Sequence, residues 1–317
     1  MPLLKEKTIL AAKVETTIGT AETLADAQAV FNAYNITINA DIEVEEREGA
    51  GAFNRLAGVP GRRGGSLSFT TDVEYDGTAS MPEWAGVLLP MCGWVESSQV
   101  YTPRTEAPGD NVKTGTLAVY EDGLKKTLAG AMGTFRFVCP SGRKAYIEWE
   151  FQGVWQAVVD ATILAGASLP TDTTVRYASA TTTFAGTSLC VEQITFDAGN
   201  NIIMRECATT DGGYISALIT DRYPTITANP EATLVATDNP YGDWLAGTQG
   251  ALSVALDGPA PVSTTSTITL SAPKAQIETI AEGDRDMMLI DDITWRCQKN
   301  GGTNDQELSI TFAESTA

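Results

Sequence analysis

Alternation of apolar and polar residues is the clearest pattern in this chain of 317 residues. In segment 35–45 every second position is mostly apolar, and the apolar members are Ile36, Ile38, Ile42 and Val44. A period of two sends successive side chains to opposite faces of a β-strand, so we expect one buried and one wet face. The wet face carries three carboxylates, Asp41, Glu43 and Glu45. Segments 66–74, 116–120, 124–128, 133–138 and 145–151 predict further strands of the first half, and 275–280, 291–297 and 307–312 predict strands of the second.

Two short helices interrupt the strand pattern. Pro82 near a first helical position predicts one helix to Leu89, and Asn239-Pro240 predicts a second to Ala246, with Asn239 as N-cap. Each helix carries one tryptophan, Trp84 or Trp244, which we expect to anchor the helix on a sheet.

The chain reads as two copies of one unit. Ile36-Thr37-Ile38 and Arg47-Glu48 recur 158 residues later as Ile194-Thr195-Phe196 and Arg205-Glu206, and Phe137-Val138-Cys139 has Trp295-Arg296-Cys297 at the same offset. Gly64–Ser68 also matches Gly212–Ser216. We therefore predict two tandem units, residues 1–157 and 183–317, joined by a linker rich in Ala, Thr and Ser at 158–182.

A Gly-rich segment, residues 49–65, is the largest difference between the copies. Arg47 and Gly65 are 18 residues apart, whereas Arg205 and Gly213 are 8 apart. The segment carries Arg55, Arg62 and Arg63 in an otherwise acidic chain. Two interpretations stay open: a solvated loop, or a basic patch that docks on the acidic body of a neighbouring copy.

Composition limits the class of protein. There is no apolar run long enough to cross a membrane and no signal peptide at the start, so we expect a protein made in a cytoplasm. The five cysteines lack a C-x-x-C pair, and we expect them to be reduced and mostly buried. The formal net charge of −19 opposes binding to nucleic-acid phosphates.

The chain lacks histidine, which removes the usual catalytic triads and the commonest general base. There is also no phosphate-binding loop motif. Carboxylate pairs such as Glu148 and Glu150 could serve a hydrolase. Alternating charge on a strand is, however, typical of a solvated face. We expect no enzyme, no metal and no cofactor.

The chain resembles the tail tube (major tail) proteins of long-tailed, siphovirus-like bacteriophages. The resemblance covers nearly the whole chain and rests on structural signatures. These are the arm Glu15-Thr16-Thr17-Ile18-Gly19-Thr20, the hairpin with the Gly-rich segment, Pro82-Glu83-Trp84, Ile147–Gly153, Gly212–Pro224 and Gly283-Asp284-Arg285-Asp286.

The resemblance implies a mainly β fold, here two tandem β-sandwich or barrel units, each with one short flanking α-helix. It also implies a virion protein, assembled in the bacterial host cytoplasm, whose rings stack into a hollow tube. Partners would be further copies, a tape-measure protein and other tail proteins, with genomic DNA passing through unbound and no membrane contact. Asp41, Glu43 and Glu45 would then line the bore, and Arg55, Arg62 and Arg63 would contact the next ring.

Two units on one chain suggest a ring of three copies with pseudo-sixfold symmetry, in preference to a hexamer whose second unit decorates the exterior. Two other classes remain as alternatives. One is a β-rich binding module or adhesin that uses Trp94, Tyr101 or Tyr241, and the other is the carboxylate-dependent hydrolase.

Overall fold

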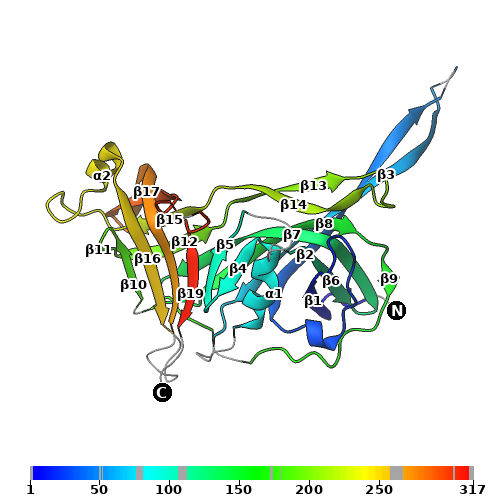
Figure 1. Cartoon of the computed structure of the whole chain (residues 1–317), viewed down its shortest axis with the longest axis horizontal. Helices are drawn as coiled ribbons and strands as arrows, with labels where there is room; N and C mark the ends of the chain where they lie inside the picture. Colours follow the sequence, from blue (N-terminus) through cyan, green and yellow to red (C-terminus); the bar gives the residue numbers. More distant parts are fainter. Residues whose placement is uncertain are drawn as a thin grey trace.

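The computed structural model describes residues 3–49, 51, 53–75, 81–105, 113–171, 174–178, 180–257, 267–302 and 304–313. Residues 1, 2 and 314–317 of the predicted units lie outside this description. The chain is mainly β, as predicted, with two short α-helices among the described residues (Figure 1). The first half contains β1 (Thr8–Val14), η1 (Asp26–Gln28), β2 (Ala33–Glu48), β3 (Arg55–Asp72), α1 (Glu83–Met91), β4 (Trp94–Ser97), β5 (Val100–Pro103), β6 (Gly115–Glu121), β7 (Leu124–Pro140) and β8 (Tyr146–Trp155).

The second half follows after a connecting segment that contains β9 (Val159–Asp160). Its elements are β10 (Thr181–Phe184), β11 (Thr187–Ser188), β12 (Val191–Asp197), β13 (Asn200–Glu206), β14 (Tyr214–Arg222), β15 (Thr225–Pro230), α2 (Pro240–Ala246), β16 (Gln249–Asp257), β17 (Thr267–Arg285), β18 (Met288–Cys297) and β19 (Ser309–Ala313).

Strand pairing follows the same order in both halves. The first half is β1-β6-β7-β8-β3-β2, and the second is β10-β16-β17-β18-β15-β12, all antiparallel. Ile36 and Ile194, matched in the sequence, lie on the corresponding strands β2 and β12. Among the described strands, neither half closes into the barrel that was one of the two expectations.

Two other sequence matches do not lie at corresponding positions. Phe137 is on β7, whereas Trp295 is on β18, whose place in the first half is taken by β8. Gly65 lies within β3, whereas Gly213 is in the turn before β14. The tandem duplication therefore stays a prediction.

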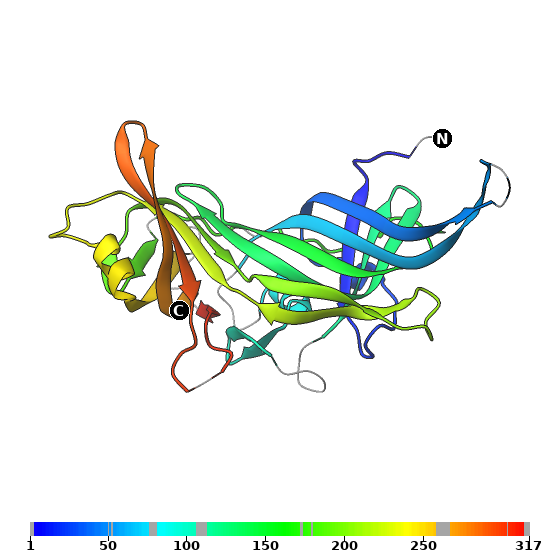
Figure 2. The same ribbon diagram turned by 90° about the horizontal axis from the view of Figure 1, so that it is seen from above.

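The two halves are joined into one sheet where β7 pairs with β12, a contact that we call the seam. Five residue pairs form the seam, from Gln193 opposite Pro140 to Asp197 opposite Arg136. The result is a continuous antiparallel run of eight strands, β2-β3-β8-β7-β12-β15-β18-β17, seen from above in Figure 2. A second connection is made where β19 pairs with β5.

The hydrophobic core is likewise continuous between the halves. Phe312 of β19 packs against Trp84 of α1, with ring centroids 5.8 Å apart, and Trp84 packs in turn on Trp149 of β8. Trp84 is 2% exposed, as predicted for a helix anchor. Trp244 of α2 is 42% exposed, so α2 is anchored differently from α1.

Both helices begin where the sequence predicts. Pro82 is the N-cap of α1, and the side chain of Asn239 accepts a hydrogen bond from Gly242 N at 3.0 Å at the start of α2. Gly247 ends α2 in a left-handed conformation, φ 65°, which glycine adopts without strain.

The Gly-rich segment 49–65 is mostly strand, which corrects the expectation of a long loop. β3 begins at Arg55, and β2 with β3 forms a two-stranded ribbon, residues 42–48 and 55–62, that projects from the body (Figure 1). Ile42 and Val44 are exposed on this ribbon because no other described element covers them. At its base glycine is needed, since a Cβ on Gly65 would approach Leu128 and Trp155 within 3 Å.

Over its described part the predicted linker, residues 158–182, packs mainly against the first half, whereas Thr181 and Thr182 belong to β10 and pair with β16 of the second half. Val175 and Tyr177 are buried, and backbone bonds join Val175 to Val73 and Ala145. The unit boundaries at 157 and 183 stay a prediction.

Candidate functional site: an open polar sheet face

One face of the eight-stranded sheet carries a polar surface that both halves build together. Alternation along each strand sends apolar side chains to the core and polar ones to the opposite side. We call this opposite side the open face, and the sheet that carries it is seen from above in Figure 2. Directly paired residues form rows across it. One row is Thr37, Ser68, Glu150 and Thr134, and a second is Glu148, Arg136, Asp197, Thr225 and Arg296.

Carboxylates outnumber cations on the open face. Arg136 donates to Asp197 across the seam at 2.9 Å and lies 3.9 Å from Glu148. The hydrogen bond to Asp197 raises the pKa of Arg136, so this guanidinium stays charged. Arg296 lies over the ring of Tyr223 at 4.2 Å. The acidic residues are Asp41, Glu148, Glu150, Asp197 and Asp292.

The three carboxylates predicted from the sequence are all exposed on β2. Asp41 lies on the open face, opposite Gly64. Glu43 and Glu45 lie farther along, on the ribbon, where Arg62 donates to Glu43 at 2.7 Å and lowers the pKa of that carboxyl. The structure of one chain does not include a bore, so their place in it stays a prediction. Glu148, Glu150, Asp197 and Asp292 were not predicted for this surface, although Glu148 and Glu150 do form the solvated strand face that the alternation indicated.

The three arginines make contacts within the chain. Arg55 pairs with Glu46 across the ribbon. Arg62 pairs with Glu43 and with Glu206 of β13, and Arg63 donates to Asp211 Oδ2 at 2.5 Å in the turn before β14. Arg62 and Arg63 therefore fasten the ribbon base to the β13–β14 hairpin of the second half. Their predicted role between rings is untested by these contacts.

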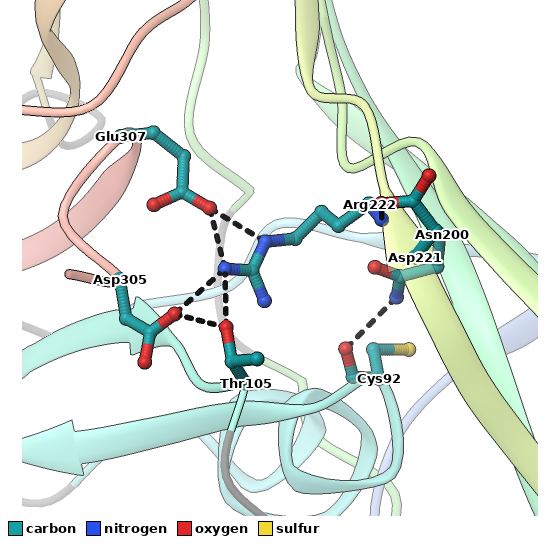
Figure 3. Close-up of polar contacts among 7 residues, drawn as sticks. All are labelled: Cys92, Thr105, Asn200, Asp221, Arg222, Asp305 and Glu307. Carbon is teal, nitrogen blue, oxygen red and sulfur yellow. Dashed lines mark hydrogen bonds and ion pairs between the residues drawn. The ribbon is translucent and has the colours of Figure 1, made fainter.

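A polar cluster around Arg222 joins the halves at the opposite end of the same hairpin (Figure 3). Arg222, 13% exposed, bonds Glu307 at 2.6 Å and Asp305 at 2.9 Å, and its third partner, Thr105, belongs to the first half. Burial would raise the pKa of Asp305, but the bonds from Thr105 and Arg222 outweigh it and lower that pKa.

Asn200 adds a second link between the halves beside this cluster. Its side-chain amide donates to the carbonyls of Cys92 and Gly133, each at 2.9 Å. The sequence alone did not identify Arg222 or Asn200 as residues that join the two halves. Their hydrogen-bond partners are more than 60 residues away along the chain, so no local sequence pattern indicates the contacts.

The alternative sites are not supported by this geometry. Trp94 and Tyr101 are buried in the core, so of the three aromatics suggested for a binding platform, Tyr241 alone is substantially exposed. Glu148 and Glu150 are both exposed, whereas a catalytic acid is usually partly buried to raise its pKa. Among the described residues, no group of three or more acidic or cysteine side chains is arranged to hold a metal ion.

Comparison with known proteins identifies the class. A family model described as phage tail tube protein matches residues 6–297, nearly the whole chain. The chain therefore belongs to the phage tail tube protein family, and it is a structural protein of the bacteriophage virion, located in the tail. No curated protein matches it in sequence. A structural family agrees with the expected absence of enzymatic activity. None of the helices in the described part of the chain has the length and apolarity to cross a membrane.

Proposed function

We propose that this protein assembles with further copies into rings that stack as the hollow tail tube, with the open face lining the bore. The observation that carries the proposal is the single eight-stranded sheet to which each half contributes four strands in the same order. Such a sheet offers a long polar surface on which the described residues form no catalytic constellation.

The acidic character of the open face suits a conduit for DNA. Phosphates approaching Asp41, Glu148 and Glu150 meet like charge, so DNA slides without adhesive contacts. Glu43 and Glu45 on the ribbon extend the same acidic surface. This part of the proposal fails if the assembled tube has a basic bore with these side chains on its outside.

The ring contains three copies, because two halves with the same strand order supply two of six equivalent positions. Native mass spectrometry of isolated rings is the test. A mass of three chains supports the trimer, and a mass of six chains contradicts it.

Assembly takes place in the host cytoplasm, around a tape-measure protein and next to other tail proteins. Negative-stain microscopy of the purified protein tests self-assembly: tubes or stacked rings are expected, and monomers at every concentration would count against it. The inward orientation of the open face has its own test. In tubes of a Cys190→Ser/Cys207→Ser background, a cysteine at Glu150 should be protected from a polymer-linked maleimide, whereas one at Leu245 on α2 should react.

A further inference from the structure

Two hollows lie on the open face, one in each half. The first, of about 340 Å³, is bounded by β2, β3, β8 and β7 and reaches Asp197 of β12. The second, of about 430 Å³, is bounded by β12, β15 and β18. In the continuous sheet β15 lies four strands from β3, about 19 Å at the spacing of neighbouring strands, so the two hollows are separate.

The two hollows occupy equivalent positions in the two halves. The strand register fixes which residues correspond, because two rows of directly paired residues match, Thr37-Ser68-Glu150 in the first half and Thr195-Thr227-Thr294 in the second. By this register, most residues that line the second hollow have a counterpart that lines the first. The open face therefore presents one kind of hollow twice.

An equivalent β-bulge borders each hollow. The register of β2 on β3 shifts between Tyr34 and Thr37. That of β12 on β15 shifts at the corresponding place, between Val191 and Ile194. In the first bulge Asn35 has a left-handed conformation, φ 53°, which asparagine adopts more readily than most residues. Because β-bulges re-aim side chains, the bulge accounts for the turn of this strand towards the hollow.

Both hollows combine the same three kinds of polar side chain: an amide, a hydroxyl and a carboxylate. The three are Asn35, Ser68 and Glu148 in the first hollow and Gln193, Thr227 and Asp292 in the second. All six residues are exposed. Gln193 donates its amide N–H to Thr195 at 3.4 Å, which leaves its carbonyl oxygen free to accept.

The charge of both hollows is also the same. The first is lined by three carboxylates and one cation, Arg136, and the second by two carboxylates and no cation, so each lining set has a net formal charge of −2. Arg136 is bonded to Asp197 at 2.9 Å and lies 3.9 Å from Glu148. Asp292 forms no ion pair within the part of the chain that the structure describes. Glu148 and Asp292 can therefore accept bonds from a bound cation.

We infer that each hollow binds one primary alkylammonium group, the group that polyamines and lysine side chains carry. An ammonium has three N–H donors and no acceptor, and each hollow offers it a carboxylate, an amide carbonyl and a hydroxyl oxygen. A guanidinium suits the sites less well, because its planar fork prefers both oxygens of one carboxylate. A metal ion also suits them less well, since the described acidic side chains form no group of three that could hold one. The position of both sites in the bore rests on the proposed function, whereas binding by a single chain does not.

Isothermal titration calorimetry of the unassembled chain at low salt tests the inference with two probes, spermidine and N-acetyl-lysine amide. Two equivalents should bind per chain, one for each hollow. Glu148→Gln or Asp292→Asn should leave one equivalent, and the double variant should bind about tenfold more weakly, because a charge-assisted hydrogen bond is lost in each hollow. Glu45→Gln and Asp286→Asn make the same charge changes at exposed residues outside the hollows and should keep two equivalents.

Choline separates recognition of the ammonium group from simple attraction of charge, because it is a cation without N–H donors. It should neither bind like spermidine nor displace it. Equal binding of choline, or undiminished binding by the double variant, would overturn the inference. Binding of both probes supports recognition of the ammonium group itself, and binding of spermidine alone supports a polyamine as its source. Tubes that form from a chain that binds neither probe would overturn the inference and leave the proposed function intact. A chain that binds both probes but never assembles would count against the proposed function alone.

Discussion

Corresponding side chains in the two halves contribute unequally to the free energy of unfolding, and the tryptophans of the two helices show this most directly. Trp84 lies between Trp149 and Phe312, where it joins the core of one half to the last strand of the other. Trp244 holds the same place in its helix but keeps 42% of its surface in water. The sequence context of the two residues is similar, and the difference arises from the elements that cover α1.

Truncating these tryptophans should therefore have unequal effects. Trp84→Ala should lower the free energy of unfolding by about 3–5 kcal/mol, because it leaves a cavity in a closed core. Trp244→Ala should lower it by less than about 1 kcal/mol. Urea unfolding followed by far-UV circular dichroism measures both, and equal losses would mean that α2 is covered as fully as α1.

The cysteines make a second comparison at this scale. Burial raises the pKa of Cys297 to about 12 and that of Cys139 still further, so neither thiol is nucleophilic in the folded chain. Hydrogen bonding to Thr209 lowers the pKa of Cys207. Cys190 is exposed, but partial desolvation of its thiol raises the pKa of Cys190. Native labelling with iodoacetamide, read by peptide mass spectrometry, should modify Cys207 first and Cys190 more slowly. Rapid labelling of Cys139 or Cys297 would show that the core opens.

At the scale of elements, the N-terminal arm is held by carboxylates. Glu15, 4% exposed, accepts hydrogen bonds from Thr114, Thr116 and the backbone of Gly19 and Gly130. Glu22 bonds Lys13 at 2.6 Å and also bonds Thr16, which together lower the pKa of Glu22 from 4.5 to about 2.

This shift gives the arm a pH dependence. Because the pKa is lower in the folded chain, ionised Glu22 stabilises the fold above pH 4.5, and that contribution is lost as the pH falls towards 2. Glu22→Gln should lower the Tm at pH 7 and should differ less from the parent as the pH falls below 4.5. Glu6→Gln, an equal charge change at an exposed residue, is the control. A Tm difference for Glu22→Gln that stays constant from pH 7 to 2.5 would contradict the assignment.

The Arg222 cluster fixes the β13–β14 hairpin and the segment before β19. Arg222→Met should cost about 2–4 kcal/mol, because it leaves Asp305 and Glu307 nearly buried without a cation. The triple variant Arg222→Met/Asp305→Asn/Glu307→Gln should recover much of the loss in chemical denaturation. No recovery would mean that the arginine acts through packing of its stem instead.

Local pattern predicted some of these elements and not others. The alternation in 35–45 and the capping residues Pro82 and Asn239 identified β2 and both helices, since those signals depend on neighbouring residues. The glycines of segment 49–65 suggested a loop. A two-stranded ribbon tolerates glycine, however, because its side chains are not packed against another layer, so a missing side chain removes no packing. For the open face, the alternation in the sequence indicated that Asp41, Glu148 and Glu150 lie on solvated strand faces. It did not indicate Asp197 or Asp292, because their position depends on the seam.

At the scale of the whole molecule, charge should govern contact with DNA. The variant Asp41→Lys/Glu148→Lys/Glu150→Lys should bind duplex DNA at about 50 mM salt and release it as salt rises, while the parent should not bind. Asp238→Lys/Asp243→Lys/Asp286→Lys, with the same change in net charge away from the open face, is the matched control. Electrophoretic mobility shift of duplex DNA by the unassembled chain, in which the open face is accessible, measures this. Equal binding by both variants would show that net charge, and not its position on the open face, determines DNA binding.

The shared sheet also determines how the chain responds to mechanical force. Pulling the halves apart along the strands would shear all the hydrogen bonds of the seam together, while β5–β19 and the Arg222 cluster resist at other points. Loading in shear ruptures hydrogen bonds collectively, whereas peeling breaks them one at a time. The chain should therefore be stiff along its own sheet, and in the proposed tube bending would be concentrated at the joints between copies.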